Sequence, residues 1–206
     1  MGMNYSIKEE NGVYQIMKGK SKVKTPRKSP VSTGNKDLAE WLLWEFENEP
    51  DVWNHLFSVR FLHFSYCDMP EISDEDKEQT KEWIKNAIEQ DPFWAFNEPM
   101  KNRALVVARY LKFLPDLIMD MPHHMFLSFI NWANMTGSII LPLHILNTLL
   151  DEASFYSLDD MDEFVEELIE YGNDMDIQFF ASIPWEEDYL AASIRTLVNY
   201  CNYSEV

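Results

Sequence analysis

The spacing of hydrophobic residues changes once along this chain, and that change constrains the fold more than any other sequence feature. Tyr5 to Glu9 and Val13 to Met17 alternate apolar and polar side chains, which is typical of strands with one buried face. Asn11-Gly12 lies between these runs, and both residues tolerate a positive φ, so the sequence predicts a tight hairpin. A third strand is expected over Ser21 to Thr25, which makes this segment a hairpin or a meander.

After residue 34 the spacing becomes helical. A first helix follows the capping residue Asn35, and its apolar face holds Leu38, Trp41, Leu42 and Phe46. A second helix is predicted from Pro50 through Phe64. Capping residues and apolar stripes predict further helices over 73–89, 100–113, 123–135, 139–151, 158–171 and 185–202.

The predicted elements define an α+β fold class. We expect a small β-rich N-terminal unit over residues 1–34, packed with helices in 35–67, and an α-helical domain over 72–206. Residues 68–76 are acidic and contain Pro70, which is typical of a joint between two halves. No apolar run reaches the roughly 18 residues that a membrane span needs, so no membrane insertion is expected.

Charge is also distributed unevenly between the β-rich N-terminal part of the chain and the rest. Residues 1–36 carry eight Lys/Arg and two Glu, whereas the remaining 170 residues carry nine bases and 33 acids. An acidic body of this kind repels nucleic acid, so we expect a protein partner and no nucleic acid. The two cysteines and the absence of a signal peptide favour the cytoplasm, or the mitochondrial matrix if a eukaryotic transit peptide is missing from this sequence.

The sequence contains no recognisable catalytic arrangement. Its six glycines are scattered and form no phosphate-binding loop, and no nucleophile elbow is present. His55 has Asp51 four residues before it, but a packed histidine is the more common reading for both His55 and His63. Asp160, Glu163 and Glu167 belong to an acidic helix face that we interpret as solvated or facing a partner. No catalytic residue, metal ion or cofactor is therefore expected.

One segment resembles a known family. Lys18 to Pro26 and Leu38 to Phe46 are similar to the N-terminal part of the assembly chaperones for the α subunit of ATP synthase. The residues that carry the resemblance are Val23, Lys24, Thr25 and Pro26, then Leu38, Ala39, Leu42, Glu45 and Phe46. The match is specific over residues 18–46 and loose elsewhere. A weaker similarity around Leu158-Asp159-Asp160 places the family's functional acidic position at Asp160, where the family has Glu.

The resemblance implies a nonenzymatic chaperone that binds an unassembled ATP synthase α subunit, or a related subunit, and shields its interface. We expect a partner-binding surface that uses Asp160, Glu163, Glu167, Trp41 and Trp44, with Trp53 and Trp132 as further exposed aromatic candidates. One alternative is an unrelated acidic adaptor or inhibitor. A second is a metal-dependent enzyme that uses Asp51, His55 and a ligand from another helix.

Overall fold

The computed structural model describes residues 5–48, 58–94, 100–143, 194–197 and 199–203. The chain divides into two compact units, one formed by residues 1–71 with 193–206 and the other by residues 72–192. Residues 193–206 belong to the N-terminal unit, although the sequence predicts them as part of the helical domain over 72–206. A four-stranded antiparallel sheet precedes a mainly helical body, which confirms the α+β class.

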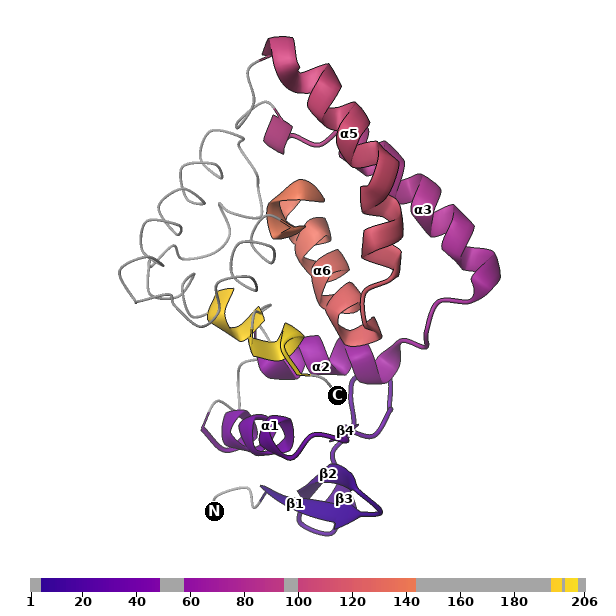
Figure 1. The fold of residues 1–206 in the computed structure, drawn as a ribbon. Coiled ribbons are helices and arrows are strands. Elements are labelled where there is room, and N and C mark those ends of the chain that lie inside the picture. Colours follow the sequence, from indigo (N-terminus) through magenta and orange to yellow (C-terminus); the bar gives the residue numbers. More distant parts are fainter. Residues whose placement is uncertain (1–4, 49–57, 95–99, 144–193, 198, 204–206) are drawn as a thin grey trace. The chain divides into compact units, whose positions relative to one another are not determined.

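The sheet of the first unit is built around β2 (Val13–Lys18), which pairs with every other strand. β1 (Tyr5–Glu10) pairs with it from Tyr5 opposite Lys18 to Glu10 opposite Val13. Asn11 and Gly12 join the two strands with φ values of 54° and 78°, the geometry that the hairpin prediction requires. Figure 1 shows this small sheet in indigo beside the N-terminal end of the chain.

The rest of the sheet differs from the predicted third strand. β3 (Ser21–Lys22) is shorter than expected, and β4 (Ser32–Thr33) forms in a segment that looks like a loop in the sequence. Both pair with β2, β3 near its end and β4 near its start. The amide of Ile16 donates to the carbonyl of Val31, so β4 is held by backbone bonds around a buried valine.

Two helices complete the described part of the first unit before residue 72. α1 (Lys36–Asn48) packs on β1 and β2 through the buried side chains of Leu38, Ala39, Leu42 and Phe46. α2 (Val59–Asp68) starts at Ser58, whose side chain accepts a hydrogen bond from the Phe61 amide. The predicted second helix is therefore confirmed from residue 59 onward, while residues 49–57 lie outside the described part. Helical residues 194–197 and 199–201 add Ile194, Leu197 and Tyr200 to this core.

The described helices of the second unit form an antiparallel arrangement around an apolar core. α3 (Asp74–Glu89) begins at Ser73, which accepts a hydrogen bond from the amide of Asp76, as the capping pattern predicts. α5 (Met100–Met119) lies beside it, and α6 (His123–Thr136) ends at Gly137 in the left-handed conformation. A further helix begins at Ile140 and is described as far as residue 143.

The end of α5 differs from the sequence prediction. The sequence places the end of this helix at residue 113, before Pro115, but α5 continues to Met119 with Pro115 inside it. Proline removes one backbone hydrogen bond and strains the helix. The helix persists because Leu114, Pro115 and Ile118 are all buried, so packing compensates for the lost bond. Among the described residues, no helix combines the length and apolarity that crossing a membrane requires.

Candidate functional site

The predicted partner-binding residues fall into two groups in the structure. Asp160, Glu163 and Glu167 lie outside the described residues, as do Trp53, Asp51 and His55. Trp41 and Trp44 lie on α1 in the first unit. Trp132 is buried in α6 and is not available to a partner, because that helix is apolar on several sides and its core face includes this ring. α1 is therefore the described part of the predicted surface.

The side of α1 that does not pack on the sheet carries two tryptophans. Trp44 is 52% exposed, and Trp41 is half-buried with its ring centroid 6.5 Å from that of Tyr203. Residues three apart on a helix are neighbours, so the two indole rings share one surface. Burial raises the pKa of the Tyr203 hydroxyl, and the nearby Asp37 carboxylate adds to that rise.

Acidic residues flank the two tryptophans. Asp37, Glu40 and Glu47 are exposed on α1 and fall on the same side of the helix at spacings of three and seven residues. Glu40 pairs with Lys36 at 3.4 Å, whereas Asp37 and Glu47 form no ion pair within the described residues. We call Asp37, Glu40, Trp41, Trp44 and Glu47 the aromatic–acidic face. It combines exposed apolar area with negative charge, the properties expected of a surface for a basic or apolar partner segment.

The position of α1 is fixed by a buried carboxylate on its other side. Glu45 is 5% exposed, and its two oxygens accept hydrogen bonds from the amides of Val59 and Arg60 at 2.9 and 3.0 Å. These are first-turn amides of α2, which have no partner within their own helix. The guanidinium of Arg60 lies 4.9 Å from the centroid of the Phe46 ring. Glu45 therefore joins α1 to the start of α2.

A second buried polar group joins three segments of the same unit. His63 is fully buried on α2, with its Nε2 3.0 Å from the Ser32 carbonyl and its Nδ1 3.3 Å from the Tyr200 hydroxyl. A carbonyl only accepts, so Nε2 carries a proton and donates to it; in the neutral imidazole, Nδ1 then accepts from the Tyr200 hydroxyl. This confirms the interpretation of His63 as a packed histidine, because both of its nitrogens have structural partners.

The two thiols lie near this cluster. The Cys67 thiol donates to the Ser32 carbonyl at 3.9 Å, and burial raises its pKa to about 11. Burial also raises the pKa of Tyr200, with Cys67 and Cys201 among the groups that contribute. Both cysteines are free thiols, and a thiol that resists deprotonation is a poor nucleophile. The raised pKa therefore makes Cys67 a poor nucleophile at neutral pH.

In the described part of the second unit, sequence reasoning missed one buried carboxylate. Asp91 is 1% exposed and accepts hydrogen bonds from the Ser138 hydroxyl and from the amides of Phe93, Ile139 and Ile140. Burial raises the pKa of the Asp91 carboxyl, and these four hydrogen bonds oppose the rise. Asp91 thus caps the start of the helix at Ile140. The Asp-Pro pair at 91–92 predicts only a turn, so no local sequence pattern indicates that Asp91 caps a helix.

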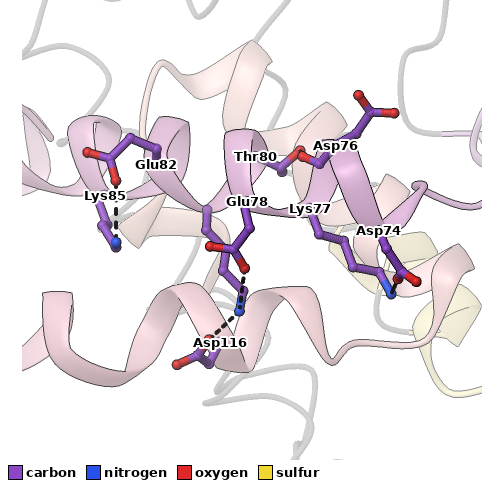
Figure 2. Close-up of polar contacts among 9 residues, drawn as sticks. Asp74, Asp76, Lys77, Glu78, Thr80, Glu82, Lys85 and Asp116 are labelled. Carbon is purple, nitrogen blue, oxygen red and sulfur yellow. Dashed lines mark hydrogen bonds and ion pairs between the residues drawn. The ribbon is translucent and has the colours of Figure 1, made fainter.

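The surface of α3 carries a row of ion pairs (Figure 2). Lys77 pairs with Asp74 and Lys85 with Glu82, each three residues apart. Lys81 pairs with Glu78 and also reaches Asp116 of α5 at 2.7 Å. Each of these lysines is neutralised by an acid nearby, so this row is a solvated surface that joins α3 to α5.

The described residues contain no group of three or more His, Cys, Asp or Glu side chains arranged to hold a metal ion. No family model matches the chain, and neither a curated protein nor a solved structure shows significant similarity to it. Within the part of the chain that the structure describes, the aromatic–acidic face of α1 is the candidate functional site.

Proposed function

We propose that this protein is a nonenzymatic assembly chaperone that binds an unassembled ATP synthase α subunit, or a related subunit, and shields its interface. The observation that carries the proposal is the aromatic–acidic face, where Trp44 is exposed beside Trp41 and acidic side chains. Tryptophan is strongly enriched among residues that dominate binding energies, and a large exposed indole costs solubility unless a partner covers it.

The ATP synthase α subunit is proposed as the partner because residues 18–46 resemble the chaperone family. The segment's apolar residues Leu38, Ala39, Leu42 and Phe46 are buried against the sheet, and Glu45 caps α2. These residues have packing roles, so their pattern supports a shared local fold of strands followed by a helix. The residues that a client would touch are the exposed ones between them, which the resemblance does not specify.

The proposal also includes Asp160, Glu163 and Glu167, which keep the role that the resemblance assigns to that region. An acidic face favours encounter with a basic client surface and raises the association rate at low ionic strength. The proposed place of action is the cytoplasm, or the matrix of mitochondria in a eukaryote. Binding requires no cofactor.

The decisive experiment is co-expression of the tagged full chain with the ATP synthase α subunit from the same organism, followed by affinity capture. We expect capture of the α subunit and less aggregation of it, as measured by light scattering. Trp44→Ala should reduce capture at least tenfold, because it removes the most exposed ring of the face. Trp83→Ala is the matched control, since Trp83 is a similarly exposed tryptophan on α3 of the other unit.

Two results would contradict the proposal. If the folded wild-type chain captures no cognate α subunit, the family assignment fails and an unrelated adaptor or inhibitor becomes the better reading. If Trp44→Ala and Trp83→Ala reduce capture equally, the aromatic–acidic face is not the site. A combined Asp160→Asn, Glu163→Gln and Glu167→Gln variant tests the acidic part separately, and it should lower the association rate more than it raises the dissociation rate.

A further inference from the structure

The exposed side of α5 differs from every other described helix surface in this chain. Leu105 is 77% exposed, Leu117 is 53% exposed and Phe113 is 44% exposed. Their positions fall at intervals of eight and four residues, which places them along one side of a helix. The buried residues Leu114 and Ile118 face the core of the unit, so this apolar row is a second hydrophobic side of α5.

Basic residues alternate with this apolar row. Arg109 lies between Leu105 and Phe113, and Lys112 directly precedes Phe113; both side chains are exposed. Neither takes part in an ion pair within the part of the chain that the structure describes, in contrast to Lys77, Lys81 and Lys85 of the adjacent α3. The only acid on this side of α5, Asp116, is already paired with Lys81.

The local charge of α5 opposes that of the molecule. Residues 100–112 contain four bases and no acid, in a chain with a net charge of −18. Screening limits electrostatic attraction to about 8–10 Å at physiological ionic strength, so an approaching segment responds mainly to the charges on this helix. A surface of apolar side chains interspersed with unpaired bases is complementary to a segment of apolar side chains interspersed with acids.

We infer that the side of α5 formed by Leu105, Arg109, Lys112, Phe113 and Leu117 is a docking surface for an acidic amphipathic helix of a partner protein. A helix fits because the row extends over twelve residues, about 18 Å along the helix, and apolar side chains at intervals of three to four residues pack against the same pattern on a second helix. Acids beside that pattern would pair with Arg109 and Lys112. This surface lies on the second unit and is independent of the aromatic–acidic face and of the function proposed for it.

The probe is a fluorescein-labelled peptide of three heptads with leucine at positions a and d and glutamate elsewhere. We expect saturable binding by fluorescence anisotropy that weakens as salt is added. Arg109→Glu with Lys112→Glu should weaken binding at least tenfold. A second peptide with lysine in place of glutamate should bind that double variant better than it binds the wild type. Leu105→Ser should weaken binding of both peptides.

The matched control is Lys20→Glu with Lys22→Glu, which changes the net charge equally at two exposed lysines, one in the turn after β2 and one in β3. The inference is wrong if this control weakens binding as much as the α5 double variant, because attraction would then be nonspecific. It is also wrong if a scrambled peptide of the same composition binds equally well. Self-association in sedimentation experiments that the α5 double variant abolishes would overturn it too, since a second copy would then be the occupant. Circular dichroism of each variant establishes that it is folded.

Discussion

The two units of this protein use buried polar groups in different ways. In the first unit, Glu45 and His63 connect segments that are far apart in the sequence, and each has partners on another element. In the described part of the second unit, long-range buried hydrogen bonding is concentrated at Asp91, while the ion pairs of α3 lie on the surface. A buried carboxylate therefore caps a helix in each unit, and the first unit adds a buried histidine that joins three segments.

The difference has a physical basis. A small sheet of short strands buries little apolar surface, so the first unit gains specificity from hydrogen bonds that fix α1 and α2 on the sheet. The second unit packs long helices whose apolar faces bury each other, and apart from the buried Asp91 the described ion-pairing charges of α3 lie in solvent. Removing a buried group should therefore be costly in either unit, whereas removing a surface pair should cost little.

The largest effect is expected for Asp91→Ala. It leaves the amides of Phe93, Ile139 and Ile140 and the hydroxyl of Ser138 without an acceptor in a buried site. At about 1 kcal/mol for each group, the free energy of unfolding of the second unit should fall by about 4 kcal/mol, close to a thousandfold in the equilibrium constant. Urea titration measures the loss, and hydrogen exchange of residues 138–141 locates it.

Asp91→Asn is the control for that variant. It keeps one acceptor oxygen and nearly the same shape, so we expect about half of the destabilisation. If the alanine and asparagine variants are both as stable as the wild type, Asp91 does not cap the helix at Ile140. If the first unit loses protection as much as the second, the two units do not respond independently, and the comparison between them fails.

The next effect concerns Cys67, which reports on the dry interior of the first unit. The folded pKa of about 11 lies above the unperturbed value of 9.0, so the folded protein holds the thiol proton more tightly than the unfolded chain does. The stability that this provides is present at pH 8 and is lost as the pH rises from about 9 through 11. At pH 8 the folded Cys201→Ala protein should react with iodoacetamide about 100-fold more slowly than the same chain in urea.

If the folded and the urea-unfolded chain react with iodoacetamide at nearly the same rate, Cys67 is open to solvent and the first unit is not dry around Ser32. Mass spectrometry assigns the modified residue. The wild-type chain should give the same rate for Cys67, and a large difference from Cys201→Ala would indicate that the substitution had loosened the helical residues 199–201. Measuring the ratio of the folded rate to the rate in urea from pH 7 to 10 separates a pKa effect from simple shielding. Only a difference in pKa makes this ratio change with pH.

Local sequence signals predicted the local structure well. Asn11-Gly12 predicted the hairpin because few residues tolerate two successive positive φ values, and Ser73 and Gly137 predicted helix ends through their capping chemistry. Pro115 misled the prediction, because sequence alone does not show that packing compensates for a lost helical hydrogen bond. The α+β class followed from the change of period, since that change reflects which faces are buried.

Long-range roles were not predictable in the same way. Asp91 caps a helix that begins almost fifty residues later, and nothing near it in the sequence indicates this. Glu45 belongs to the pattern that resembles the chaperone family, but the sequence does not show that its carboxylate accepts hydrogen bonds from the first amides of α2. Trp44 was predicted as a binding residue and is exposed, whereas the same reasoning about Trp132 was wrong. Helical spacing alone does not tell which apolar residues a second helix covers.

A smaller effect is expected for Glu45→Ala in the first unit. It leaves the amides of Val59 and Arg60 without their acceptor, so the free energy of unfolding should fall by about 2 kcal/mol, roughly thirtyfold in the equilibrium constant. Glu45→Gln keeps one acceptor oxygen and should lose about half as much. Glu47→Ala, an exposed neighbour on α1, is the matched control and should stay close to the wild type. Equal losses for the alanine variants at positions 45 and 47 would contradict the capping role.

The smallest effect is expected for the ion pair between Lys81 and Asp116, which joins α3 to α5 on the surface. The Lys81 ammonium lowers the pKa of the Asp116 carboxyl, so any stability from the pair is present above the unperturbed pKa of 3.8 and is lost as the pH falls through the lowered value. Solvent screens this pair, and Lys81 retains Glu78 as a second partner. Asp116→Asn should therefore leave the urea midpoint unchanged within error at pH 7, both in low salt and in 1 M salt. A clear loss in low salt that disappears in 1 M salt would show that surface charge contributes to the second unit, and the contrast between the units would then be one of degree.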